Sequence, residues 1–320
     1  MNLKGKAVLV TGGAGFIGSH LVDQLLLEDA KFVIAVDDMS LGKERNLLDA
    51  KKNQPFRLVK GSAADFSLMK SLAETYDIEV VFNLEVISLP ASLVNPKKSI
   101  DENVGIVVTL CELQRLGYFK TLIHFSSSEV YGTAQYSPMD EQHPLGAHTP
   151  YAASKAAGDL IVASYRKTFG TDYAIIRPFN NYGPRQNEGL YAGVIPLTIK
   201  RIMDNQKPFI TGNGQQTRDY IYVTDTVKAC IDIYKNEQAR GRTINIGSGQ
   251  EISIYDLIHH IARLMEYRGH IDYKNCRAGD VERLITDVSL AKEMIGFNPS
   301  VGFDEGIERT IDWYMNHPGE

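Results

Sequence analysis

Cysteine is scarce in this chain of 320 residues. Cys111, Cys230 and Cys276 are odd in number and far apart, so they fit neither a disulfide framework nor a zinc site and are typical of a reducing compartment. Long apolar runs are absent as well, and no segment is long enough for a membrane-spanning helix. The first strand-like segment begins within a few residues of Met1, which leaves no room for a signal peptide. We therefore expect a cytoplasmic protein with no membrane partner.

The chain also lacks a strong net charge of either sign. The chain has 34 Lys and Arg against 39 Asp and Glu, so its net charge of -5 gives no support for a nucleic-acid partner. The histidines show no metal-ligand spacing with carboxylates or cysteines, and we expect no metal site. The composition that remains, 43% hydrophobic and 23% charged, is typical of a globular enzyme with a large core.

One motif near the start organises the rest of the chain. Residues 7–27 read as an apolar strand, a glycine-rich turn and a helix, which is the context that a dinucleotide site requires. Gly12 allows the tight turn, Gly15 lets the backbone approach a pyrophosphate, and Gly18 lets the helix approach the strand. A second strand ends in Asp37, at the distance expected for a carboxylate that binds ribose.

Strands and helices alternate along the chain, which predicts an α/β fold with a Rossmann-like, doubly wound parallel sheet. We expect strands at 7–11, 32–36, 56–60, 80–84, 121–125, 173–177, 218–223 and 243–246. We expect helices at 19–27, 101–116, 150–169, 195–203, 226–234, 254–265, 289–295 and 303–314. The pattern changes after Pro178, where residues 180–193 form a polar loop too long to be an idle connector. We predict a dinucleotide-binding domain over 1–178, with returns near 218–246, and a smaller C-terminal α/β substrate-binding domain over 179–320.

Tyr151 and Lys155 lie one helical turn apart on the helix expected over 150–169. A phenol has a pKa of about 10, but a fixed ammonium beside it stabilises the phenolate. The phenolate can then take the proton of a sugar hydroxyl while hydride leaves the same carbon. Ser127, at the end of the neighbouring strand, is placed to hydrogen-bond the same oxygen. These three residues are the predicted catalytic group.

Together these motifs resemble the extended short-chain dehydrogenase/reductases of the nucleotide-sugar epimerase and dehydratase group. The resemblance covers nearly the whole chain and also rests on the segments 126–132, 177–185 and 216–225. It implies tightly held NAD, a nucleotide-diphosphate sugar as substrate, and Asp37 on the adenosine ribose, where its charge would repel the 2′-phosphate of NADP. It further implies a homodimer formed by the helices over 101–116 and 150–169.

The resemblance also implies two sets of binding residues. The NAD-binding set is Gly12, Gly15, Phe16, Ile17, Gly18, Asp37, Asp38, Ser40, Gly42, Asp65, Phe66, Leu84, Asn103, Ser126, Tyr151, Lys155 and Pro178, with the adenine placed near Asp65 and Phe66. The substrate-binding set is Glu85, Ser88, Ser127, Asn180, Val194, Arg218 and Arg277. The two arginines suit diphosphate oxygens, which guanidinium groups bind in a bidentate way. Glu85 departs from the family, which has a small alanine there, and its carboxylate is expected on the substrate, on the cofactor's ribose or in solvent.

Glu129 separates the reactions that the resemblance allows. In the 4,6-dehydratases a glutamate before a Val-Tyr-Gly-like segment removes the C5 proton after C4 oxidation, and Glu129 directly precedes that segment here. Dehydratases of deoxythymidine-diphosphate glucose have an aspartate just before it as the acid at C6. Ser128 stands at that place, so the acid is open between Ser128, Glu129 and water. The stretch 129–155 looks most like bacterial dehydratases of UDP-N-acetylglucosamine, and we predict that activity.

The sequence leaves other reactions of the same family open. A UDP-sugar 4-epimerase needs only the Ser–Tyr–Lys group, and Ser128 also occurs in the UDP-glucuronate decarboxylase type. A 5,6-dehydratase belongs to the same set of alternatives. The intact Ser127, Tyr151 and Lys155 speak against a non-catalytic NAD-binding protein.

Overall fold

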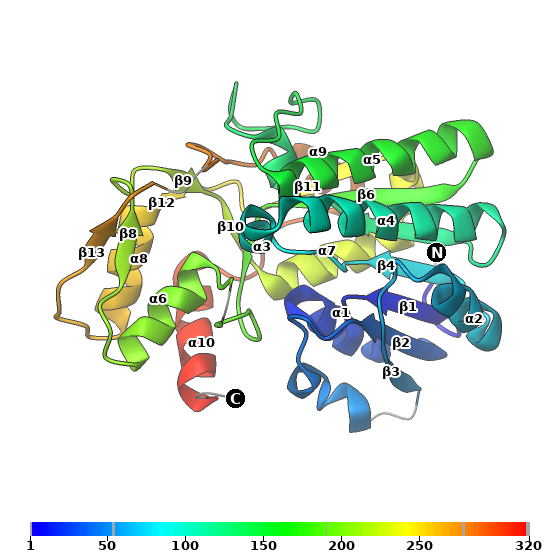
Figure 1. Ribbon diagram of the computed structural model, residues 1–320, viewed down its shortest axis with the longest axis horizontal. Coiled ribbons are helices and arrows are strands. Elements are labelled where there is room, and N and C mark those ends of the chain that lie inside the picture. The colour runs from blue at the N-terminus through cyan, green and yellow to red at the C-terminus, as the bar shows by residue number, and fades with distance from the viewer. Residues whose placement is uncertain (1, 53–54, 190, 277–278, 318–320) are drawn as a thin grey trace.

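The computed structural model describes residues 2–52, 55–189, 191–276 and 279–317 (Figure 1). At its centre is a seven-stranded parallel sheet with the order β11-β6-β5-β4-β1-β2-β3. The strands are β1 (Ala7–Thr11), β2 (Phe32–Asp37), β3 (Phe56–Lys60), β4 (Val80–Asn83), β5 (Thr121–Phe125), β6 (Asp172–Pro178) and β11 (Thr243–Ile246). The predicted Rossmann-like, doubly wound α/β class is confirmed.

Helices cover both faces of this sheet, which is why its strands are nearly continuous apolar runs. One face is covered by α1 (Phe16–Leu27), α7 (Val223–Lys235) and α9 (Ser289–Ile295). The other is covered by α2 (Phe66–Tyr76), α4 (Pro96–Arg115) and α5 (Pro150–Phe169). Figure 1 shows α4 and α5 side by side, with the short α3 (Leu89–Val94) near their ends. No helix in the described part of the chain is long and apolar enough to cross a membrane.

Most residues after 178 build a smaller body with its own hydrophobic core. Its helices are α6 (Val194–Met203), α8 (Ile254–Leu264) and α10 (Phe303–Asn316). Its strands pair as β7 (Asn180–Tyr182) with β10 (Tyr220–Tyr222), β9 (Thr217–Arg218) with β12 (Ile252–Ser253), and β8 (Phe209–Thr211) with β13 (Asp272–Lys274). The chain returns to the central sheet with α7 and β11. On this arrangement we propose the division at residue 178 with a return near 218–246.

Four short 3-10 helices complete the described elements. They are η1 (Glu44–Leu47), η2 (Ala50–Lys52), η3 (Ser128–Tyr131) and η4 (Glu237–Ala239). Of these, η3 follows β5 and belongs to the site described below.

Local capping explains where helices depart from the predicted bounds. The helix α4 begins at Pro96 rather than at residue 101, because Asn95 Oδ1 accepts a hydrogen bond from Lys98 N and proline suits a first turn. The helix α2 was not predicted at all. Its buried residues Met69, Leu72 and Ala73 recur at helical spacing, and they pack against the sheet.

The strand predicted over 218–223 is interrupted at Asp219. Its buried carboxylate accepts N–H hydrogen bonds from Ser248, Gly249 and Thr286. These partners are distant in the sequence, so the local pattern of apolar residues gives no sign of the break. The segment therefore divides into β9 and β10, and α7 begins directly after β10.

Candidate active site

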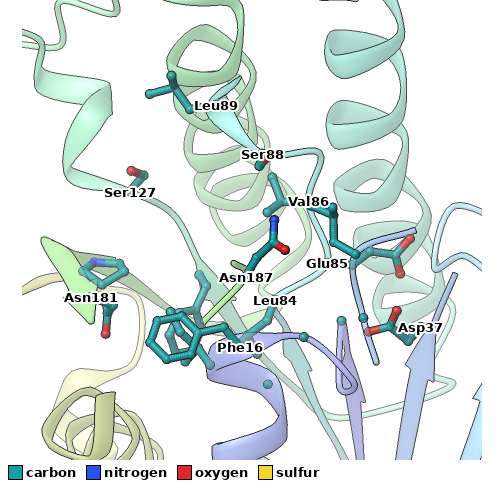
Figure 2. A pocket seen from close by; sticks show the side chains of 18 of the residues that line it. Phe16, Asp37, Leu84, Glu85, Val86, Ser88, Leu89, Ser127, Asn181 and Asn187 are labelled. Carbon is teal, nitrogen blue, oxygen red and sulfur yellow. The ribbon is translucent and has the colours of Figure 1, made fainter. Parts of the chain in front are cut away.

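A long cavity runs over the carboxyl ends of the central strands, where doubly wound sheets bind their ligands (Figure 2). Its wall is formed by the glycine turn after β1, the ends of β2 and β4, the segment after β5 and the first turns of α5. Most of the predicted NAD-binding set lines it: Gly12, Gly15, Phe16, Ile17, Gly18, Asp37, Asp38, Ser40, Gly42, Leu84, Ser126, Tyr151, Lys155 and Pro178. The predicted substrate residues Glu85, Ser88, Ser127 and Asn180 line it as well.

The glycine turn leaves room for a diphosphate but not for side chains. Gly12 has a φ of +65°, and a Cβ on Gly18 would lie 2.1 Å from the carbonyl oxygen of Gly12. The helix α1 begins after Gly15, and no side chain caps its first turn. Backbone N–H groups at such a helix start, together with the helix dipole, bind anions. The turn therefore fits the pyrophosphate of NAD.

Asp37 lies at the end of β2 and is only 4% exposed. Its Oδ2 accepts a hydrogen bond from Ala14 N and its Oδ1 one from Met39 N, both at 2.9 Å. Burial raises the pKa of Asp37, and these N–H groups oppose that rise. Gly42 leaves the space the carboxylate needs, because a Cβ there would lie 2.3 Å from Asp37 Oδ1. The N–H of Gly15 also acts on this carboxylate, and of its about four lone-pair positions one remains to accept from a ribose hydroxyl.

The predicted catalytic residues meet at the opposite end of the cavity. Ser127 caps η3 by accepting a hydrogen bond from Glu129 N at 3.2 Å, and its side chain also hydrogen-bonds Tyr151. Burial raises the pKa of Tyr151 to about 12, the Ser127 hydrogen bond opposes this, and the negative charge of Glu129 adds to it. Tyr151 therefore needs additional positive charge nearby to act as a base at neutral pH.

A buried charge network lies behind this group. Lys155 Nζ donates to the carbonyl oxygen of Phe125, and burial lowers the pKa of Lys155 to about 8 while the charge of Asp159 opposes the fall. Asp159 in turn accepts from Arg177 Nε at 2.9 Å, and Arg177 Nη1 donates to Tyr131 Oη at 2.8 Å. At neutral pH Lys155 stays mostly protonated and holds a positive charge near Tyr151. The sequence analysis missed Asp159, although it lies four residues after Lys155 on the same helix face.

A second cavity continues from the first toward the smaller body of the molecule. The two share Leu89, Glu129, Asn180 and Asn181 in their walls. Glu129 therefore lies at the junction of the two cavities, close to Ser127 and Tyr151.

The second cavity collects further residues of the predicted substrate set. Val194, at the start of α6, and Arg218, on β9, both line it. The Arg218 residue is 5% exposed, and its Nη2 forms an ion pair with Asp280 at 2.7 Å. Arg277 lies outside the described residues.

The adenine position predicted at Asp65 and Phe66 is not supported. Asp65 is the N-cap of α2, and its Oδ1 accepts from Leu68 N at 3.0 Å. Phe66 is 39% exposed, and neither residue lines either cavity. The unpredicted helix explains the error, because a carboxylate before a helix start is used for capping.

Two other predicted residues also lie outside the walls of both cavities. Asn103 is buried in α4, accepts from Ile87 N at 2.8 Å and donates to Ser154 Oγ at 2.9 Å, so it holds the loop after β4 against α5. Ser128 is 3% exposed and lines neither cavity. The structure thus disfavours Ser128 as the acid at C6.

Glu85 lines the first cavity, but at the end away from the catalytic residues. Figure 2 shows its carboxylate near Asp37, with Ser127 at the other end. Its oxygens accept from Ser62 Oγ at 2.7 Å and from Ala63 N at 2.9 Å. The predicted contact with the sugar is therefore disfavoured, and the position favours the adenosine half of the cofactor.

Several wall residues were not predicted. They are Leu41, Lys43, Asn46, Val86, Leu89, Phe125, Phe179, Asn181, Arg185 and Asn187. For three of them the signal was present, because Asn181, Arg185 and Asn187 belong to the long polar loop over 180–193. The others follow strand ends whose side-chain directions depend on tertiary packing.

Known proteins resemble this chain along almost its whole length. The profile of the GDP-mannose 4,6 dehydratase family matches residues 9–310. The UDP-glucose 4-epimerase of Mycolicibacterium smegmatis is 36% identical over 310 residues, which cover 96% of this chain and 98% of the relative. The dTDP-glucose 4,6-dehydratase of an Actinoplanes species is 32% identical over 318 residues, which cover 96% of this chain and 97% of the relative.

A solved structure with bound NAD has a similar fold. The dTDP-glucose 4,6-dehydratase of Streptomyces venezuelae, with NAD and TYD bound, matches with a TM-score of 0.93 at 29% identity over 98% of both chains. The glycine turn and Asp37 in this chain are consistent with the same cofactor. The chain belongs to the extended short-chain dehydrogenase/reductase family of nucleotide-sugar epimerases and dehydratases.

Proposed function

We propose that this protein is an NAD-dependent nucleotide-sugar 4,6-dehydratase, acting on a UDP-sugar such as UDP-N-acetylglucosamine. The observation that carries the proposal is the position of Glu129. Glu129 lines both cavities, and its negative charge raises the pKa of Tyr151. A 4-epimerase has no use for a carboxylate at this junction, whereas a dehydratase needs a base for the C5 proton.

The side chains divide the proton transfers between them. When bound, NAD supplies the hydride acceptor for C4 and the hydride donor for C6. Tyr151, one helical turn from the ammonium of Lys155, takes the proton of the C4 hydroxyl, and Ser127 holds the same oxygen. Glu129 then takes the C5 proton and returns it to the departing C6 oxygen, which leaves as water. Because Ser128 lines neither cavity, we assign both the base and the acid role to this one carboxyl group. Return of hydride to C6 leaves C5 to be protonated, and the proton that Tyr151 took from the C4 hydroxyl balances that last step.

Product mass tests the proposal. The protein is incubated with UDP-, GDP-, CDP- and deoxythymidine-diphosphate sugars, and we expect the loss of one water from a UDP-sugar. In Glu129→Gln we expect elimination to fall roughly 10²–10⁴-fold, while C4 oxidation persists and reduced cofactor accumulates. Glu293→Gln, an exposed change of the same charge on α9, serves as control and keeps the wild-type rate. Dehydration at the wild-type rate by Glu129→Gln contradicts the role of Glu129.

A second candidate is a UDP-sugar 4-epimerase. The epimerase relative reported above is 36% identical to this chain, against 32% for the dehydratase relative. The group Ser127, Tyr151 and Lys155 suffices for that reaction. The same incubations separate the candidates, because an epimerase product has unchanged mass and an altered sugar NMR spectrum. Loss of carbon dioxide would instead identify a decarboxylase.

We also propose a homodimer formed through α4 and α5. Several apolar side chains on these helices are exposed, among them Val108 at 39%, Leu160 at 63% and Phe169 at 54%. A second copy would cover them in a bundle of four helices. Light scattering should report a dimer for the wild type and a monomer for Leu160→Glu. A monomeric wild-type protein would contradict the proposal.

A further inference from the structure

The adenosine end of the first cavity contains a carboxylate that neither the catalytic group nor the predicted adenine site explains. Glu85 follows β4, and its backbone N donates to Thr11 Oγ1 at 3.1 Å. Its side chain then reaches the loop between β3 and α2, where Oε1 accepts from Ser62 Oγ and Oε2 from Ala63 N. Both contacts hold the carboxylate in one place while the residue still lines the cavity.

The order of the strands places this carboxylate relative to NAD. The catalytic residues follow β5 and begin α5, the glycine turn follows β1, and Asp37 ends β2. A dinucleotide with its pyrophosphate on the glycine turn and its adenosine ribose on Asp37 extends its base toward β3. Ser62 and Ala63 directly follow β3. Glu85, which lies near Asp37 in Figure 2, is therefore held where we expect the base.

Three carboxylates, those of Glu85, Asp37 and Asp38, meet at this end, and while ionised they only accept hydrogen bonds. A carboxylate has about four lone-pair positions, and Glu85 uses one on each oxygen for Ser62 and Ala63. The neighbouring carboxylates of Asp37 and Asp38 are acceptors as well. The polar edge of adenine carries ring nitrogens that accept and a single donor, the exocyclic amino group. Of the polar groups of adenine, only that amino group can donate a hydrogen bond to the Glu85 carboxylate.

We propose that Glu85 is a specificity-determining residue for the cofactor, which accepts a hydrogen bond from the exocyclic amino group of adenine. The inference rests on NAD occupying this cavity, as proposed above, and not on the reaction that follows. Burial raises the pKa of Glu85 to about 7, and the charges of Asp38 and Asp37 add to this. A donor from the base offsets part of the cost of keeping this carboxylate ionised.

Competition between two nucleotides tests the assignment. Full-length holoprotein is incubated with equal amounts of isotopically labelled NAD and of the NAD analogue that has unsubstituted purine in place of adenine. Labelled NAD reports that exchange has occurred, and the bound nucleotides are released with acid and quantified by chromatography. We expect the wild type to retain NAD over the analogue by roughly tenfold. In Glu85→Ala the ratio should fall to near one, and in Glu85→Gln, which keeps one oxygen acceptor, it should be intermediate.

Control variants distinguish this role of Glu85 from other roles that the residue could have. Glu74→Ala removes an exposed carboxylate from α2 and should keep the wild-type ratio. A wild-type ratio near one, or an unchanged ratio in Glu85→Ala, overturns the inference and leaves a ribose contact or a structural role. Equal loss of both nucleotides from a folded Glu85→Ala, judged by circular dichroism, overturns it as well. The ratio does not depend on turnover, so failure of the proposed reaction is distinguishable from failure of this inference.

Discussion

Replacing Glu85 by glutamine should stabilise the protein at alkaline pH and leave its stability unchanged at acidic pH. Burial raises the pKa of Glu85 from 4.5 to about 7, and the two groups whose charges add to this are Asp38 and Asp37. A carboxyl whose folded pKa is raised binds its proton more tightly in the folded state. Its contribution to stability is therefore complete below about pH 4.5 and is lost as the pH rises through about 7.

The size of the effect follows from the same two values. The difference between 4.5 and about 7 corresponds to about 3 kcal/mol, which is an upper limit because Glu85 is not fully buried. Glutamine imitates the protonated acid, since its amide N–H can donate to Ser62 Oγ while its oxygen accepts from Ala63 N. For a chain of 320 residues, about 3 kcal/mol corresponds to a melting temperature shift of roughly 4 °C.

Thermal unfolding of the protein freed of nucleotide measures this directly. Melting curves by circular dichroism are recorded for the wild type and Glu85→Gln near pH 4 and near pH 8.5. We expect the two proteins to melt together at the lower pH and the variant to melt higher at the upper pH. Glu74→Gln should follow the wild type at both. A variant that melts with the wild type or below it near pH 8.5 refutes the reasoning, because no buried charge would then be removed.

Three further substitutions probe other parts of the cavity. Tyr151→Phe should lower kcat roughly 10²–10⁴-fold while bound NAD, measured after acid release, stays at the wild-type level. Gly18→Ala should yield protein with little bound NAD, because its Cβ would lie 2.1 Å from the Gly12 carbonyl oxygen; a normal NAD content would contradict the geometry of the turn. Asp159→Asn leaves Arg177 buried without its counter-charge and should cost about 3–5 kcal/mol in a denaturant titration. The same change lowers the pKa of Lys155 further, so the alkaline limb of the kcat/KM profile should move to lower pH.

The fold was predictable because its strands and helices are locally encoded. Buried parallel strands are apolar throughout, and helices such as α5 carry their own signals, with Thr149 capping the first turn, Pro150 within it and Gly170 ending the helix in a left-handed conformation. The errors lie where distant contacts decide. The break at Asp219 depends on partners more than 25 residues away in the sequence, among them Ser248 at a separation of 29. The omission of α2 is of another kind, because Met69, Leu72 and Ala73 lie at helical spacing behind the Asp65 cap, and these local signals were overlooked.

The site was predictable to the level of which strand end each residue follows, but not of where its side chain points. Glu85 and Glu129 show the difference, since both are glutamates directly after strand regions of one parallel sheet. Glu129 follows the Ser127 cap and lies at the junction of the two cavities, whereas Ser62 and Ala63 hold Glu85 at the opposite end of the first cavity. The two donors that hold Glu85 come from the loop between β3 and α2, distant in the sequence, so sequence position alone left both glutamates as candidates for the substrate. Each glutamine variant should therefore affect only the end of the cavity at which it lies. Glu129→Gln should slow the elimination step, and Glu85→Gln should change the choice of nucleotide and the pH dependence of stability.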